Sequence, residues 1–293
     1  MDLLDELQTR VLCGDGAIGT LLIEEGIPLG RCFEELCVSE PDRIEKIHEQ
    51  YIGAGARVIE TNTFGANAVR LERFGFEGRV AEINRAAAQI AAKAAKGKDV
   101  YVAGSVGPLG ISGDEAAARG IDRAQCFREQ VTALLDGGAD LIFFETFMDF
   151  EEMEIALRAR QEVDGGLAIC SFACAPGGEL SSGMMLVEAF AKLRVSGSEM
   201  LGVNCMSING PHGMVQLLQR VPSDYLLAAY PSAGSPKYHD GRFIYQTAPD
   251  CFAQSAREMV AEGARLIGGC CGTNPAHIAA IAVAIANLGL VAQ

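Results

Sequence analysis

Short apolar runs alternate with longer segments of helical period along the chain. The runs are short enough to be buried strands, and the longer segments repeat apolar residues every three or four positions. This alternation is typical of βα units that build a parallel sheet. The expected strands are Val11–Cys13, Val58–Glu60, Val100–Gly104, Leu141–Glu145, Leu167–Phe172, Leu201–Asn204, Leu226–Ala229 and Arg265–Ile267. The expected helices are Asp42–Ala54, Val80–Lys96, Asp122–Asp136, Asp149–Val163, Leu186–Val195, His212–Arg220, Pro249–Glu262 and Asn274–Leu288.

Eight repeats in 293 residues predict an α/β fold of the (β/α)8 TIM barrel type. A doubly wound open sheet is the alternative. Gly-Ala segments such as Gly53-Ala54-Gly55-Ala56 and Glu262-Gly263-Ala264-Arg265 close a helix and enter a strand, as the loops at the stability face of a barrel do. No linker or low-complexity tract divides the chain. We therefore expect a single domain over residues 1–293.

Three cysteines fall at the carboxyl ends of expected strands, where the chemistry of a barrel is located. Cys205 ends the sixth strand, and the adjacent Cys270 and Cys271 follow the eighth between glycines that let the backbone bend. Zinc binds thiolates readily and accepts three protein ligands with a fourth position open. A single free cysteine more often packs as a small hydrophobe, so ligation and packing both remain open from the pattern alone.

Two carboxylates lie on the same expected rim. Glu145 follows a strongly apolar strand, so we expect its carboxylate to be partly desolvated and paired with a cation. Asp15 lies between Gly14 and Gly16, where a turn or N-cap role is the alternative. A thiol-binding metal beside carboxylates predicts a substrate with a thiol at one end and an ammonium at the other.

Composition excludes several other classes of function. The formal net charge of −14 disfavours nucleic acid and anionic membrane as partners, because both require a basic face. No run of eighteen apolar residues predicts a membrane span. The acidic N-terminus does not resemble a signal peptide, so we expect a cytoplasmic protein. Ten scattered cysteines in a chain of this length do not suggest a disulfide scaffold.

Four motifs together resemble the homocysteine S-methyltransferase family over nearly the whole chain. They are Cys13-Gly14-Asp15-Gly16-Ala17-Ile18-Gly19-Thr20, Glu60-Thr61-Asn62-Thr63-Phe64-Gly65-Ala66-Asn67, Val203-Asn204-Cys205 and Gly268-Gly269-Cys270-Cys271-Gly272-Thr273. The resemblance is strongest to the homocysteine-binding module of cobalamin-dependent methionine synthase and of bifunctional proteins that fuse this module to a methylenetetrahydrofolate reductase.

The resemblance implies a role for each matching residue. Cys205, Cys270 and Cys271 correspond to the Zn²⁺ thiolates. The substrate-binding residues that it implies are Glu145 for the homocysteine ammonium, with Asp15 near it, the backbone of Gly16 and Ala17 for the carboxylate, and Asn62 and Asn204 on the rim. Ser232 is a departure, because the family often has Asn there, and this leaves the resting fourth zinc ligand open.

The implied activity is transfer of a methyl group from an activated donor to the zinc-bound thiolate of homocysteine, which gives methionine. Zinc would hold the thiol ionised, so no catalytic residue beyond that thiolate is expected, and His48, His212, His239 and His277 are interpreted as helix or loop residues. The donor is either a small molecule or a domain that carries methylcobalamin or methyltetrahydrofolate.

Two alternative functions remain open at this point. One is a barrel methyltransferase or demethylase that acts on another thiol or methyl donor. The other is a redox protein in which Cys270 and Cys271 cycle between thiols and a vicinal disulfide.

Overall fold

The computed structural model describes residues 3–163, 166–207, 213–239 and 242–289. Eight parallel strands form one sheet in the spatial order β1-β10-β7-β6-β5-β4-β3-β2. The strands of this sheet are β1 Leu12–Cys13, β2 Val58–Glu60, β3 Tyr101–Val106, β4 Leu141–Phe147, β5 Leu167–Phe172, β6 Met200–Ser207, β7 Leu227–Ser232 and β10 Ala264–Ile267. A parallel bridge between Gly14 and Val58 joins the two ends of the sheet. The predicted (β/α)8 barrel is thereby confirmed, and the open-sheet alternative is wrong.

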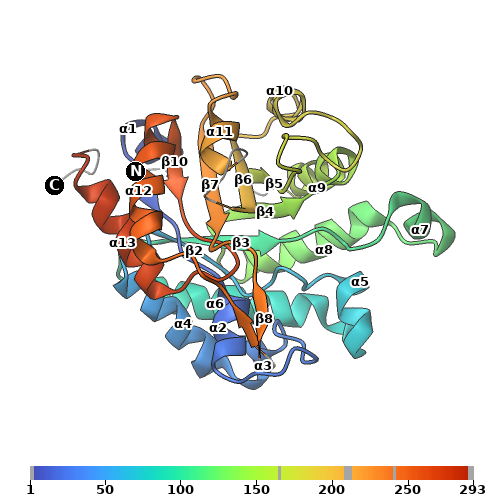
Figure 1. The fold of residues 1–293 in the computed structure, drawn as a ribbon. Helices are drawn as coiled ribbons and strands as arrows, with labels where there is room; N and C mark the ends of the chain where they lie inside the picture. Colours follow the sequence, from blue (N-terminus) through green and yellow to red (C-terminus); the bar gives the residue numbers. More distant parts are fainter. Residues whose placement is uncertain (1–2, 164–165, 208–212, 240–241, 290–293) are drawn as a thin grey trace.

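Helices surround the strands in Figure 1. The helices that alternate with strands are α4 Pro41–Gly53, α6 Val80–Ala95, α8 Arg123–Asp136, α9 Phe150–Glu162, α10 Leu186–Val195, α11 Met214–Leu218, α12 Pro249–Ala261 and α13 Pro275–Ala286. Each predicted helix is present within a few residues of its expected bounds, although His212 lies outside the described residues. Side-chain caps explain several of the starts: Asp122 and Asp149 accept from the third backbone N–H of α8 and α9, and Asn274 forms a capping box with His277.

Several elements were not predicted. They are α1 Leu3–Thr9, α2 Ile18–Glu24, α3 Leu36–Ser39, α5 Ala68–Leu71, α7 Gly113–Ala118, the short 3-10 helices Glu72–Phe74 and Glu77–Arg79, and the antiparallel pair β8 Lys237–His239 and β9 Arg242–Ile244. Leu3 and Leu7 of α1 belong to the same buried cluster as Leu12 and Leu266. Helix α1 therefore packs against the strand side chains that fill the interior of the barrel. The predicted Gly-Ala loops are present, and Gly55, Gly138 and Gly263 each adopt a positive φ between 96° and 105° where a helix passes into a strand.

Candidate active site

Three thiols lie together at the carboxyl ends of the strands. The sulfur atoms of Cys205, Cys270 and Cys271 lie within 4.8 Å of one another, and no other group of three potential metal ligands is this close in the part of the chain that the structure describes. The Cys205 and Cys271 sulfurs are 3.7 Å apart. Two sulfurs bound to one tetrahedral zinc at about 2.3 Å would be separated by about 3.8 Å. The predicted three cysteines are therefore brought together with a spacing that fits a metal.

A bulge at the end of β6 directs Cys205 into this cluster. The pairing of β6 with β7 shifts register between Asn204 and Ser207, and Cys205 has a φ of 60°. A non-glycine residue in the left-handed region costs on the order of 1–3 kcal/mol, and such outliers concentrate at functional sites. The same distortion recurs in β4, where Thr146 has a φ of 62° next to Glu145 and the pairing with β5 shifts. The bulges in β6 and β4 therefore turn the Cys205 thiol and the Glu145 carboxylate toward the same end of the barrel.

The Gly-Gly-Cys-Cys-Gly segment is held between two neighbouring strands by its backbone. Gly269 donates to the carbonyl of Asp15, Cys270 donates to the carbonyl of Pro231, and Cys271 accepts from Ala233, each at 2.8 Å. Gly272 has a φ of 79°, and a Cβ there would lie 2.1 Å from the Tyr245 ring. Glycine is therefore needed at this position for both conformation and space.

Hydrogen bonds couple the three thiols electrostatically. Bonds from Cys205 and Cys270 lower the pKa of Cys271 well below that of a free thiol, whereas the bond to Cys205 is the main cause that raises the pKa of Cys270. The hydrogen bond with Cys270 lowers the pKa of Cys205, but the hydrogen bond with Cys271 and burial outweigh it and raise that pKa to about 11. Three sulfur donors at strand ends, one of them readily ionised, are a donor set that suits a thiophilic metal such as zinc.

Ser232 lies beside the cluster. It is the last residue of β7, is 6% exposed, and its hydroxyl is 3.8 Å from the Cys205 sulfur. The position that departs from the family pattern is therefore adjacent to the thiols, and its side chain hydrogen-bonds a sulfur.

Three carboxyl groups converge next to the thiols. Asp15 accepts from the backbone N–H of Glu60 at 2.9 Å, Glu60 shares a side-chain hydrogen bond with Glu145, and Ser105 donates to Glu145 at 2.5 Å. Burial raises the pKa of all three carboxyl groups, and their mutual repulsion raises those of Asp15 and Glu60 further. None of them forms an ion pair with a basic side chain among the described residues. No basic side chain among the described residues therefore supplies the positive charge that would stabilise this buried cluster of carboxyls.

Asn204 stands behind this carboxyl cluster. Its amide oxygen accepts from Thr146 N–H at 2.9 Å and from the Ser171 hydroxyl at 2.8 Å, and its amide nitrogen donates to Thr146 Oγ1 at 2.6 Å and to Glu145 at 3.4 Å. The side chain is 1% exposed. The structure thus places Asn204 as a link between the bulges of β4 and β6.

The other predicted substrate-binding residues lie around the β1 and β2 ends. Asn62 donates to the Phe33 carbonyl at 2.7 Å. The backbone N–H of Ala17 donates to the Thr273 hydroxyl at 3.2 Å, so this donor already has a partner, and a Cβ at Gly16 would lie 2.7 Å from the same hydroxyl.

A cavity of about 440 Å³ joins the thiols to Glu60 and Glu145, whereas the predicted residues Asp15 and Asn204 do not line it. Its lining includes the predicted residues Gly16, Ala17, Asn62, Glu145, Cys205, Cys270 and Cys271. Glu60, Ser105, Thr146 and Tyr230 also line it, and sequence reasoning did not single these out. For Glu60 a signal existed, because it ends a predicted strand as Glu145 does. Tyr230 reads as an ordinary strand residue.

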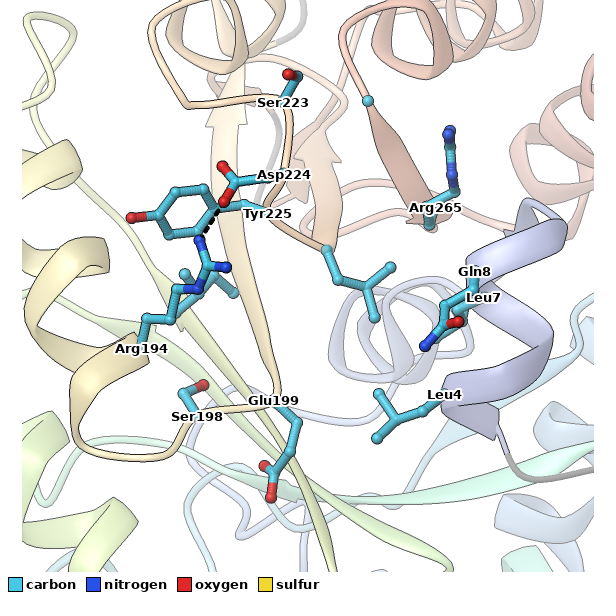
Figure 2. Close-up of a pocket in the computed structure, with 13 residues that line it drawn as sticks. Leu4, Leu7, Gln8, Arg194, Ser198, Glu199, Ser223, Asp224, Tyr225 and Arg265 are labelled. Carbon is cyan, nitrogen blue, oxygen red and sulfur yellow. Dashed lines mark hydrogen bonds and ion pairs between the residues drawn. The ribbon is translucent and has the colours of Figure 1, made fainter.

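A second cavity of about 420 Å³ lies at the opposite ends of the strands, between α1 and the segments that enter β6 and β7 (Figure 2). Its charged groups are largely paired: Arg194 binds Asp224 at 2.6 Å and lies over the Tyr225 ring, and Glu199 binds Arg160 at 3.0 Å. No thiol lines this cavity. The first cavity is therefore the one with the candidate chemistry.

Two of the four histidines have structural roles in helices, and His239, expected in a helix or loop, is instead the last residue of β8. His48 is fully buried in α4, and burial lowers its pKa to about 4. His277 caps α13 and contacts the Phe252 ring. His212 lies outside the described residues.

No helix in the described ranges is long and apolar enough to cross a membrane. All ten cysteines are free thiols.

Comparisons with known proteins agree with this geometry. Residues 12–285 match the homocysteine S-methyltransferase family. Methionine synthase from Mycobacterium tuberculosis is 33% identical over 98% of this chain, and that from Mycobacterium leprae is 32% identical. The chain spans about a quarter of the length of these relatives, 26% and 25% respectively.

A solved structure of comparable size is also similar. The homocysteine methyltransferase MmuM from Escherichia coli, in its metallated form, superposes with a TM-score of 0.78 at 29% identity, over 96% of this chain and 98% of that one. The carboxyl transferase domain of Rhizobium etli pyruvate carboxylase, at 15% identity and a TM-score of 0.55, shares the fold alone. The family match over most of the chain and the convergence of the three cysteines lead to one conclusion: this chain belongs to the homocysteine S-methyltransferase family.

Proposed function

We propose that residues 1–293 form one homocysteine-binding barrel domain that transfers a methyl group from an activated donor to the sulfur of homocysteine, giving methionine. The observation that carries this proposal is the pairing of two unlike subsites in one cavity. Three thiols line one part, and carboxyls without a cation line another. Homocysteine has a thiol and an ammonium, and these two groups are complementary to the two subsites.

Cys205, Cys270 and Cys271 would hold Zn²⁺. Their sulfurs have the spacing and the softness that zinc requires, and the cavity beside them leaves room for a fourth ligand. When bound, zinc supplies one thing to the reaction: it favours the thiolate form of a coordinated thiol at neutral pH. Ser232, which hydrogen-bonds Cys205, orients that sulfur from outside the cluster.

The carboxyl cluster would fix the other end of the substrate. Glu145 is held by Ser105 and by Asn204, so its position is set before the ligand arrives. An ammonium placed beside Glu145 and Glu60, which line the cavity, would replace the repulsion between these carboxyls by attraction and favour their ionised forms. Binding at both ends would orient the sulfur toward the donor, which supplies much of the rate in a transfer between two bound groups.

The apolar lining completes the site. Ile18, Ile23 and Phe33 line the same cavity and would exclude water from the reacting sulfur. The donor is either a small methyl donor or a domain that carries methylcobalamin or methyltetrahydrofolate. The cytoplasm is the compartment that we propose, since all ten cysteines are free thiols.

The test is to incubate zinc-loaded protein with homocysteine and a panel of donors (S-methylmethionine, betaine, methylcobalamin) and to measure methionine by mass spectrometry. Cys271→Ser is expected to lose both the metal and the activity. Cys126→Ser, in α8 away from the cavity, is the matched control and is expected to retain both. Full activity in Cys271→Ser, or methylation of other thiols but not of homocysteine, contradicts the proposal.

A further inference from the structure

Tyr230 forms part of the floor of the cavity. Its side chain is 3% exposed and packs in the inner barrel layer, edge-on to Phe143 with ring centroids 5.1 Å apart. Two glycines leave room for the ring. A Cβ at Gly14 would lie 2.1 Å from the Tyr230 hydroxyl oxygen, and a Cβ at Gly268 would lie 2.3 Å from the ring edge. The ring therefore has one tightly defined position beneath the site.

The hydroxyl of Tyr230 has no hydrogen-bond partner among the described residues. It is buried beside the carboxyl cluster, where the negative charges of Glu60 and Asp15 act on it. Burial is the main cause that raises its pKa well above the ordinary value, so the hydroxyl stays neutral and retains a free acceptor. A buried polar group without a partner is destabilising, and in a native protein it calls for a specific explanation. This one lines a cavity that also contains carboxyls without a cation.

We propose that the Tyr230 hydroxyl is a binding group for the substrate ammonium, on the floor of the cavity below the carboxyls. This inference rests on the proposed function. An ammonium has three N–H donors and needs three acceptors when it is removed from water. Carboxylate oxygens supply some of these, and the tyrosine oxygen supplies another. Tyr230 therefore contributes to the choice of amino thiols over thiols that lack the amino group.

The experiment compares two ligands on two variants by titration calorimetry of zinc-loaded protein. The ligands are L-homocysteine and 4-mercaptobutanoate, which has the same thiol and carboxylate but no ammonium. Tyr230→Phe removes one oxygen and leaves the ring in place. Tyr225→Phe, at the opposite end of the barrel, is the matched control. Because the Tyr230 hydroxyl has no hydrogen-bond partner among the described residues, Tyr230→Phe is not expected to lower the Tm.

The expected result is a selective loss of affinity. Tyr230→Phe should bind homocysteine about 10- to 100-fold more weakly, as for a lost hydrogen bond to a charged group, and bind 4-mercaptobutanoate within about twofold of wild type. Equal losses for both thiols, or no loss for homocysteine, overturns the assignment of Tyr230. If wild-type protein does not bind homocysteine, the proposed function fails instead, and the two failures are distinguishable.

Discussion

Replacing Asn204 by Ala tests how the site is held in shape. The Asn204 amide joins the β4 and β6 bulges through bonds to Thr146, Ser171 and Glu145. Its removal leaves the Thr146 N–H unpaired at a residue with a φ of 62°. The Ser171 hydroxyl, which is buried, loses its acceptor as well.

The size of the effect follows from those contacts. An orphaned buried donor costs about 1–3 kcal/mol, and Ser171 can recover part of its loss by rotating its hydroxyl. We expect Asn204→Ala to lower the free energy of unfolding by about 2–4 kcal/mol, which corresponds to a fall in Tm of roughly 3–7 °C for a domain of this size. Without its hydrogen bonds to Asn204, the backbone at Thr146 would relax and displace the neighbouring Glu145. The affinity for homocysteine should therefore fall about tenfold, while zinc is retained.

Urea unfolding and homocysteine titration of the same samples provide the assay. Ser171→Ala is the matched control, because it removes one bond to Asn204 and leaves the bonds to Thr146 and Glu145. It should cost about 1 kcal/mol and leave affinity unchanged. If Asn204→Ala matched wild type in both stability and affinity, the amide could not be what holds the two bulges.

Two further predictions concern packing and pH. Gly268→Ala would place a Cβ 2.3 Å from the Tyr230 ring and should destabilise the protein by about 1–3 kcal/mol. Gly53→Ala is the control, because Gly53 has open space around it and the substitution should not destabilise the protein. Thermal unfolding measures the Tm of both variants, and equal Tm values would refute the packing argument. His48 has a folded pKa of about 4, below the unfolded value of 6.5, so its contribution to stability is complete above pH 6.5 and is lost as the pH falls toward 4, by up to about 3 kcal/mol. His48→Leu should reduce the loss of unfolding free energy between pH 6.5 and pH 4, as measured by urea unfolding at each pH. If the variant lost as much stability as wild type over this range, groups other than His48 would be responsible.

The barrel follows closely from the sequence because its strands are buried on both faces. Leu167–Phe172 and Leu186–Val195 match β5 and α10 at both ends, where a continuous apolar run and a periodic segment are each clearly bounded. The β8 and β9 pair was missed because Lys237–His239 and Arg242–Ile244 are short and lack a sustained apolar alternation. Helix α1 was missed because its Leu3 and Leu7 gain their partners only from the assembled barrel.

The site was predicted in part. Cys270 and Cys271 were singled out because they are adjacent, flanked by glycines and follow a strand, and Cys205 because it also follows a predicted strand; the topology of a barrel brings such strand ends together. The left-handed backbone at Cys205 has no local sequence signal, since it depends on how β6 pairs with β7. Tyr230 was missed for the same reason, because its importance comes from neighbours on other strands, whereas Glu60 ends a predicted strand as Glu145 does and was not singled out.

The most direct test of the account is the zinc content of reduced protein purified without chelator, followed by zinc X-ray absorption before and after homocysteine is added. We predict about one zinc per chain, bound by the sulfurs of Cys205, Cys270 and Cys271, with the number of sulfur ligands increasing by about one when homocysteine binds. A protein without zinc, or a zinc whose sulfur coordination does not respond to homocysteine, would contradict the central claim that this cluster presents a metal to the substrate thiol.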